Sequence, residues 1–305
     1  MLIFTEQCLN GLQFGLLLFL LAAGLTLIFG IMDLVNLAHG SLYMMGAYFA
    51  ASLSALTGSL LLGAALALAA TLLVGIAIEV VVMRRLYGRD HLDHLLATFG
   101  LILFFNELVR LLWGPAALSV PLPDWLNRPI EILPGFFYSA YRLSIIVVSL
   151  ATALLLYLLV MRTRIGMLIR AGATNREMLG ALGVNVRLLF TFVFGVGAAL
   201  AGLAGVMQAP TLTAFTGMGE NILILAFVVI VIGGIGSIRG ALMASLFIGL
   251  ADTLGRAYLP DVLAHMLGPA AAATVVPALS SMLVYLLMAM VLLLRPRGLF
   301  PAAGQ

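Results

Sequence analysis

The sequence contains no lysine, and all 15 of its basic residues are arginines. Without lysine the chain cannot form a phosphate-binding P-loop or a Schiff base with pyridoxal phosphate. Its one cysteine, Cys8, excludes an intramolecular disulfide and a cysteine metal cluster. We therefore expect neither a cofactor nor a metal on this chain, and we expect any ATP and magnesium chemistry to take place on partner subunits.

Charge of either sign is also scarce. Charged residues make up 9% of the chain and hydrophobic residues 64%, with a mean hydropathy of +1.21. Soluble domains are about 25% charged and about 45–50% apolar, so the composition predicts an integral membrane protein in a lipid bilayer. The net charge of +3 does not indicate a nucleic-acid partner. The first apolar run, 9–30, exceeds the about 7–15 residues of a secretory signal core, so we expect it to span the membrane and remain.

Apolar segments recur along the whole chain. A membrane-spanning helix needs about 20 apolar residues, and the pattern predicts one all-α polytopic helix bundle over 1–305 with about eight or nine crossings, some of them short or broken. The segments are 9–30, 37–56, 60–83, 92–113, 143–161, 188–208 and 276–294, and the shorter pair 221–233 and 240–258.

The arginines predict the orientation. Ten of the 15 lie in three connections, at 84–94, 162–187 and 295–297. The positive-inside rule places such connections in the cytoplasm. We therefore expect 114–142 outside, the C-terminus in the cytoplasm and, with nine crossings, the N-terminus outside.

The stretch "GIMDLVNLAHGSLYMMGAY" (30–48) interrupts the apolar sequence with Asp33, Asn36 and His39. Polar side chains at membrane depth are costly and persist only against protein or water. One interpretation is that they line or gate a transport path. The other is that they cap a cytoplasmic turn, while nearby glycines allow close helix packing.

A second break resembles the first. "HGSLYM" (39–44) and "RGALMA" (239–244) share Gly and Leu in register, and paired interrupted segments often mark a transport path. We expect helices to start near Ser41 and Ser237 and to offer N–H groups to a carboxylate in a shared cavity. Glu220 opens a short helix and is a candidate outer gate. The substrate-path candidates are Asp33, Asn36, His39, Gly40, Ser41, Glu220 and Ser237.

The segment 162–187 carries five of the arginines. Apolar residues recur there near helical spacing, and small residues follow, which predicts one or two short amphipathic helices outside the bilayer. A segment that rests on anionic lipid explains the arginines, but the turn in "ATNREMLGALGVN" favours docking into a protein groove. The ATPase-coupling candidates are Arg170, Arg176, Glu177, Gly180 and Gly183.

Three blocks in order, "GLTLIFGIMDLVNLAHGSLYMMGAY", "RTRIGMLIRAGATNREMLGALGVNV" and "ILILAFVVIVIGGIGSIRGALMASLFIGLADT", resemble those of the LivH-type permease subunits of bacterial branched-chain amino-acid ABC transporters. The resemblance covers nearly the whole chain. It implies a permease that itself catalyses no reaction and that takes leucine, isoleucine or valine from a periplasmic solute-binding protein. It also implies a second, LivM-type permease and two cytoplasmic ATP-binding subunits that dock on the arm at 165–183. Related permeases serve urea, short amides or aromatic acids, so the substrate stays open.

Two other classes of protein compete with this interpretation. A proton-coupled carrier would use Asp33, His39 and Asp252 as an intramembrane relay, but it leaves the arm unexplained. A membrane-embedded enzyme would need clustered acids and histidines, and the chain offers only His91 and His94 close together. The remaining charges are expected to pair locally, as Glu107 with Arg110, Asp252 with Arg256, and Glu79 in a bridge near Arg84.

Overall fold

The computed structural model describes residues 2–300 and is almost entirely helical. Within that part of the chain, seven helical stretches are long and apolar enough to cross a membrane. The predicted class, an all-α polytopic membrane protein, is confirmed. The elements are α1 (Leu2–Met32), α2 (His39–Thr57), α3 (Leu60–Ile78), a π-helical turn η1 (Glu79–Met83), α4 (Arg84–Leu86), α5 (His91–Trp113), β1 (Pro129–Leu133), β2 (Phe136–Ser139), α6 (Ala140–Arg162), α7 (Arg164–Thr174), α8 (Arg176–Ala181), α9 (Val186–Gln208), α10 (Met218–Gly233), α11 (Ile238–Leu267) and α12 (Pro269–Leu294).

Each apolar segment of the sequence forms a helix, but two of these helices fall outside the seven candidate spans. They are α2, with 19 residues, and α10, with 16. At 1.5 Å per residue α10 is only about 24 Å long, less than a hydrocarbon core of about 30 Å. A count of nine crossings therefore stays a prediction.

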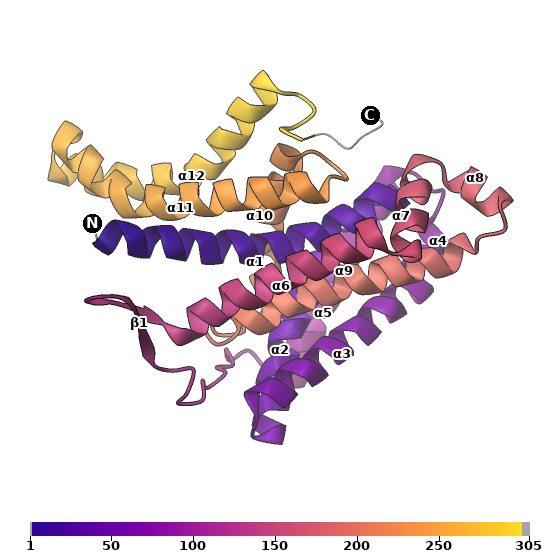
Figure 1. Cartoon of the computed structure of the whole chain (residues 1–305), viewed down its shortest axis with the longest axis horizontal. Coiled ribbons are helices and arrows are strands. Elements are labelled where there is room, and N and C mark those ends of the chain that lie inside the picture. Colours follow the sequence, from indigo (N-terminus) through magenta and orange to yellow (C-terminus); the bar gives the residue numbers. More distant parts are fainter. Residues whose placement is uncertain (1, 301–305) are drawn as a thin grey trace.

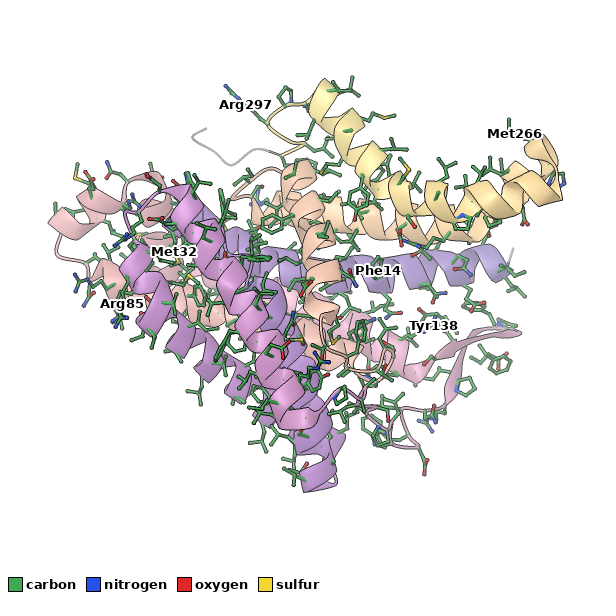
Figure 2. The ribbon with its side chains drawn as sticks, turned by 180° about the vertical axis from the view of Figure 1, so that it is seen from behind. Phe14, Met32, Arg85, Tyr138, Met266 and Arg297 are labelled. Carbon is green, nitrogen blue, oxygen red and sulfur yellow. The ribbon has the colours of Figure 1, made fainter. Side chains whose placement is uncertain are left out.

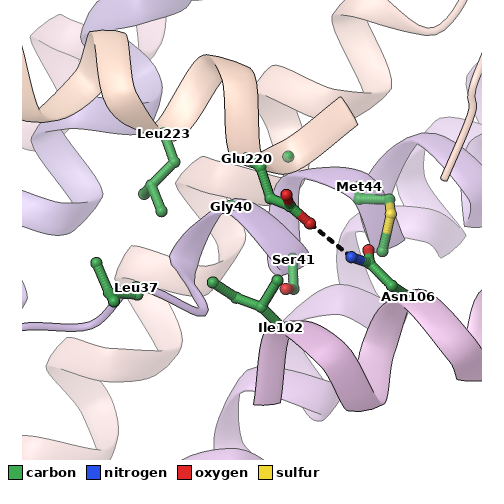
Figure 3. A pocket seen from close by; sticks show the side chains of 9 residues that line it. Leu37, Gly40, Ser41, Met44, Ile102, Asn106, Glu220 and Leu223 are labelled. Atoms are coloured by element: carbon green, nitrogen blue, oxygen red, sulfur yellow. Dashed lines mark hydrogen bonds between the residues drawn. The ribbon is translucent and has the colours of Figure 1, made fainter. Parts of the chain in front are cut away.

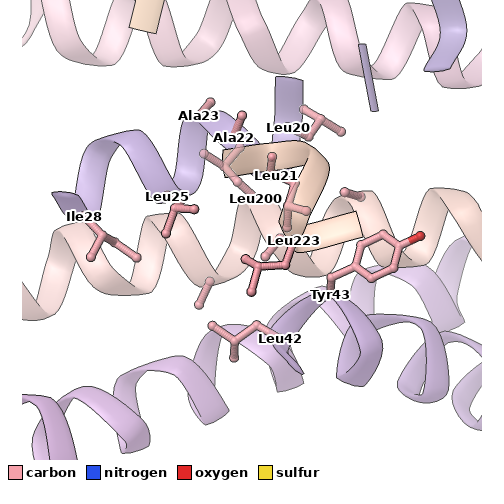
Figure 4. Packing of buried hydrophobic residues seen from close by; sticks show 14 of the residues in the cluster. Leu20, Leu21, Ala22, Ala23, Leu25, Ile28, Leu42, Tyr43, Leu200 and Leu223 are labelled. Carbon is pink, nitrogen blue, oxygen red and sulfur yellow. The ribbon is translucent and has the colours of Figure 1, made fainter. Parts of the chain in front are cut away.

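Helix α1 lies at the centre of the bundle. It is apolar on all sides, and 83% of its most apolar window is buried, against 11% for α12 and 22% for α5. A helix that is hydrophobic all round belongs in a core, and α1 packs on α6, α9, α10 and α11. Figure 4 shows the core where α1, α2, α9 and α10 meet. Each helix contributes a buried side chain to one hydrophobic cluster there: Leu21, Tyr43, Leu200 and Leu223, respectively.

Glycines bring these helices into backbone contact, as the packing interpretation predicted. A Cβ added at Gly15 of α1 would lie 2.7 Å from the carbonyl oxygen of Ser245 in α11. A Cβ added at Gly24 would lie 2.7 Å from the carbonyl oxygen of Gly197 in α9. Small residues let membrane helices approach this closely, so van der Waals contact between backbones replaces the hydrophobic effect that lipid cannot supply.

The molecule has two distinct ends (Figure 1). The arginine-rich end holds α4, α7, α8 and the C-terminal end of α1, and the hairpin end holds β1, β2 and the N-terminus. Figure 2 shows Met32 and Arg85 at the first end, with Tyr138 and Met266 at the second. The last described residues reach the end of α10, where the Leu299 and Phe300 N–H groups donate to the carbonyls of Ile232 (2.8 Å) and Gly233 (3.1 Å).

Candidate functional site: the meeting of two helix starts

The first break turns back into the bundle. Helix α1 ends at Met32, and Asp33 adopts a left-handed conformation with φ of 50°. Six residues later the His39 ring nitrogen Nε2 lies 3.2 Å from the carbonyl oxygen of Leu21. Leu21 is about three turns, or about 16 Å, before the end of α1. Helix α2 therefore begins deep in the bundle, and the segment 33–38 is a re-entrant connection.

Two of the three polar residues in this break are fully enclosed. Asp33 is exposed, whereas the relative exposures of Asn36 and His39 are 0%. No side chain caps α2, whose N-cap position is Ala38. The interpretation that these side chains cap a surface turn is therefore wrong for Asn36 and His39, because the chain passes inward before the helix begins.

Their polar atoms are incompletely paired. Among the described residues, Asn36 Oδ1, Asn36 Nδ2 and His39 Nδ1 are buried with no hydrogen-bond partner. Burying such atoms without partners costs about 1–3 kcal/mol each by protein mutational data. The break therefore carries unused hydrogen-bonding capacity at the centre of an apolar bundle.

The start of α2 meets the start of α10. A Cβ at Gly40 would overlap the carbonyl oxygen of Gly219, and a Cβ at Gly219 would overlap that of Gly40. Only glycine permits this crossing. The next residue, Glu220, lies in the first turn of α10, where a carboxylate suits the positive end of the helix dipole. Glu220 and Ser41 are therefore brought together from positions far apart in the sequence.

A narrow crevice lies at this crossing, against α5, and is too tight to hold a water molecule (Figure 3). Across it the Asn106 amide nitrogen donates to Glu220 Oε1 at 2.6 Å. The Ser41 side chain is 4% exposed and makes no hydrogen bond within residues 2–300. The lining residues are Leu37, Gly40, Ser41, Met44, Ile102, Asn106, Gly219, Glu220 and Leu223. Sequence reasoning missed Asn106, because nothing local marks an asparagine in α5 as the partner of an acid in α10.

Ser237 lies elsewhere. Its hydroxyl oxygen accepts from the Gly240 N–H at 3.1 Å and caps α11. A Cβ at Gly30 would lie 3.2 Å from Gly236, so this second break sits beside the C-terminal end of α1. Ser41 lies at the start of α10 and Ser237 just past its end, about 21 Å apart along the helix. The expected shared cavity between Ser41 and Ser237 is wrong, because α10 separates them.

The predicted helical arm is confirmed as α7 and α8. Thr163 caps α7 by accepting from the Gly166 N–H (3.0 Å), and Asn175 caps α8 by accepting from the Met178 N–H (2.9 Å). Gly183 ends the arm with φ of 84°.

All five coupling candidates on this arm are exposed. Arg170 is the one that also contacts a neighbouring helix, because it donates to the carbonyl of Val160 at the end of α6. The arm also exposes large apolar side chains, since Leu182 is 74% exposed and Met178 58%. An apolar face with flanking charges is typical of a surface that binds another protein or a membrane.

The expected local ion pairs form. Asp252 and Arg256 are joined at 2.9 and 3.0 Å, and Glu107 and Arg110 lie 3.8 Å apart. Asp252 lines a hollow with Gln7 near the N-terminal end of α1, while Asp33 follows the opposite end. The structure therefore does not bring Asp33, His39 and Asp252 together as a proton relay.

Glu79 forms a buried bridge, as expected, but with more partners than the sequence indicated. It is 0% exposed and accepts from Arg84 Nη2 (3.1 Å), Thr191 Oγ1 (2.7 Å) and the Tyr87 hydroxyl (2.5 Å). Burial, followed by the hydrogen bond to Glu79, raises the pKa of Tyr87 above its ordinary value. The network ties η1 and α4 to α9 at the arginine-rich end.

Comparison with known proteins assigns the family. Residues 7–292 match the family model described as branched-chain amino acid transport system / permease component. The chain belongs to this permease family. It is similar to the high-affinity branched-chain amino acid transport system permease protein BraD of Pseudomonas aeruginosa, with 33% identity over 264 residues that cover 83% of this chain and 86% of BraD.

Two further relatives agree. The high-affinity branched-chain amino acid transport system permease protein LivH of Escherichia coli is 31% identical over 278 residues, covering 85% of this chain and 88% of LivH. A probable branched-chain amino acid transport permease protein LivH of Methanocaldococcus jannaschii is 28% identical over 255 residues, covering 80% and 78%. No solved structure matches the chain. These relatives are permease components, and this chain is accordingly a multi-pass membrane permease of the same kind.

Proposed function

We propose that the chain is the translocation subunit of an ATP-binding-cassette importer for leucine, isoleucine and valine. The observation that carries the proposal is its similarity, over more than four fifths of its length, to permeases named for branched-chain amino acid transport. A solute-binding protein on the periplasmic side delivers the substrate. The chain itself catalyses no reaction and binds no cofactor.

The arm supports the ATPase partnership. Helices α7 and α8 project at the arginine-rich end with exposed Met178, Leu182 and Glu177 (Figure 1). Two cytoplasmic subunits that hold ATP and magnesium dock on this arm, and Arg176, Glu177, Gly180 and Gly183 form the contact. Arg170 positions α7 from behind. By the positive-inside rule the arginines favour a cytoplasmic location for this end and for the C-terminus, with the chain in a bacterial inner membrane.

The re-entrant connection at 33–38 supports a substrate path through this part of the chain. Asn36 and His39 offer unpaired polar atoms at depth, and the crevice beside Gly40, Ser41 and Glu220 adjoins them. The path runs past this break between the chain and a second, LivM-type permease. Asp33 lies at its cytoplasmic mouth, and Ser237 belongs to the neighbouring break.

Uptake into proteoliposomes tests the proposal. The chain, its second permease and both ATPases are reconstituted with loaded binding protein, and radiolabelled leucine is followed with and without ATP. We expect ATP-dependent accumulation of leucine, isoleucine and valine that orthovanadate stops and a protonophore leaves intact.

Three outcomes would contradict it. Uptake that a protonophore abolishes and ATP does not affect would indicate a proton-coupled carrier. Accumulation of urea, short amides or aromatic acids in place of leucine would reassign the substrate. A complex that forms without any ATPase bound would remove the role of the arm.

A further inference from the structure

We infer that the crevice between α2, α5 and α10 is a binding site for an aliphatic α-amino acid zwitterion. In this site Glu220 takes the ammonium group, Ser41 and the start of α2 take the carboxylate, and aliphatic side chains take the rest. The inference rests on the proposed function and adds to it a specific site on the permease.

The depth of Glu220 is the first step. Its neighbour Gly219 crosses Gly40, which follows His39 at the level of Leu21, well inside the bundle. Glu220 is nevertheless exposed on the surface of the isolated chain. A carboxylate that faced lipid at such depth would be costly, whereas one that faces a water-filled path or a partner is tolerated. The face of α10 that carries Glu220 therefore faces the path or a partner subunit and not lipid.

The partner of Glu220 is the second step. Within residues 2–300 the Glu220 side chain accepts one hydrogen bond, which comes from a neutral amide, Asn106 Nδ2, at 2.6 Å. The described residues give Glu220 no arginine or histidine ion pair. A neutral amide leaves the negative charge of the carboxylate unbalanced, whereas an ammonium group would add a direct attraction between opposite charges. An incoming ammonium therefore displaces Asn106 favourably, and Asn106 acts as a latch that holds α5 against α10 when no substrate is bound.

The carboxylate end is the third step. Helix α2 has 19 residues and no side-chain cap, but its His39 and Ser41 N–H groups already donate to the carbonyls of Asn36 and Ala38. Of its first three N–H groups only that of Gly40, which lines the crevice, has no backbone partner among the described residues, and it lies at the positive end of the helix dipole. The Ser41 hydroxyl lines the same crevice, is 4% exposed and has no hydrogen-bond partner within residues 2–300. This hydroxyl can donate a hydrogen bond to a carboxylate at the helix start.

The apolar wall is the fourth step. Leu37, Met44, Ile102 and Leu223 complete the lining, and no aromatic residue is among them. A branched aliphatic side chain finds matching surface here. A urea or amide could donate an N–H to Glu220, as Asn106 does, but it carries no positive charge and would leave the apolar wall without a counterpart. The site therefore favours a zwitterion with an aliphatic side chain.

The crevice is closed in this structure by the Asn106–Glu220 bond and opens when α5 moves. Only 22% of the apolar window of α5 is buried within this chain, so few contacts inside the chain oppose this motion.

Thiol protection tests the site directly. Cys8→Ser removes the native thiol, and Ile102→Cys then places a single reporter in the crevice of the assembled transporter. We expect leucine to slow its labelling by about 5-fold or more, in line with occupancy of most sites. Neither 4-methylpentanoate, which lacks the ammonium, nor isoamylamine, which lacks the carboxylate, should protect. Leu103→Cys, the neighbouring position with its side chain 53% exposed, is the matched control and should show no protection.

Glu220→Gln in the same background should abolish protection, and in uptake assays it should lower the rate by about 10-fold or more, as loss of a charged hydrogen bond predicts. Glu107→Gln, an acid one residue from Asn106 that points away, should leave uptake unchanged.

Equal labelling with and without leucine, protection by either half-molecule, or protection that survives Glu220→Gln would overturn the site. None of these results affects leucine uptake by the unaltered complex. The proposed function is tested by that uptake alone, so the site can be wrong while the proposed function is right. If the reporter variant does not assemble, unchanged uptake by Glu220→Gln overturns the inference by itself.

Discussion

The two breaks in the apolar sequence look alike, yet the structure uses them differently. At the second break, Ser237 caps α11 and the C-terminal segment pairs with the end of α10, so the local polar groups are satisfied. At the first break, the chain re-enters the bundle and leaves Asn36 and His39 with unpaired atoms at full burial. A break whose polar groups are hydrogen-bonded stabilises the helices beside it. A break whose buried polar atoms have no partner lowers stability, so stability does not explain why those atoms are there. This difference is the reason that the proposed transport path is assigned to the first break and not to the second.

The largest effect on folding is expected from a bulky side chain at the crossing of α2 and α10, beside the first break. Gly40→Val would drive a side chain into the backbone of Gly219, which cannot retreat without moving α10. Overpacking against backbone exceeds the usual about 1–3 kcal/mol of core strain, so we expect no folded, monodisperse permease on size-exclusion chromatography.

Gly100→Val is the control for this change, because a Cβ at Gly100 of α5 meets nothing within 4 Å. It should leave the elution profile and melting temperature close to those of the parent. A folded Gly40→Val protein would show that the two helix starts are not in backbone contact.

A smaller but more informative effect is expected from Asn36→Leu. The change replaces two unpaired buried atoms with apolar surface, so the folded state should gain about 1–3 kcal/mol, visible as a higher melting temperature in detergent. Uptake by the assembled complex should fall by about 10-fold, because the polar contact needed during passage is lost.

Thr26→Val is the matched change, since the Thr26 hydroxyl is also buried without a partner, but on α1 away from the crevice lining. It should raise the melting temperature and preserve uptake. If Asn36→Leu also preserves uptake, the first break is structural and the comparison between the two breaks collapses.

The smallest effect is expected at the second break. Ser237→Ala removes one helix cap, which costs about 0.5–2 kcal/mol, and uptake per folded complex should stay within about 2-fold of the parent. Thermal unfolding and uptake normalised to folded protein measure both. Ser59→Ala, which removes the longer cap bond of α3 at 3.5 Å, should cost less. A loss of transport in Ser237→Ala beyond its loss of folded protein would give the second break a direct role.

Local features of the fold were predictable from the sequence. The apolar runs that became helices, the capped arm at 162–187 and the pair of Asp252 and Arg256 all depend on residues within a few turns of one another. Helical periodicity and i,i+4 spacing report such contacts directly.

The site was only partly predictable, because it depends on contacts between distant residues. Gly40, Ser41 and Glu220 were each singled out, but the crossing of α2 and α10 and the bond from Asn106 join positions about a hundred residues or more apart. The similarity between the two breaks suggested the wrong pair, Ser41 with Ser237. Similar sequences predict similar local shapes, and they do not report that α10 lies between them.

The pairing of Leu299 and Phe300 with the end of α10 has a consequence for biosynthesis. The ribosome makes α10 well before these residues, with α11 and α12 in between. Until translation reaches Phe300, the carbonyls of Ile232 and Gly233 lack the partners that they have in the finished protein. The hydrogen bonds at the second break are therefore completed only when the last described residues have been made. A chain released before that point would leave these two carbonyls at the end of α10 without their partners.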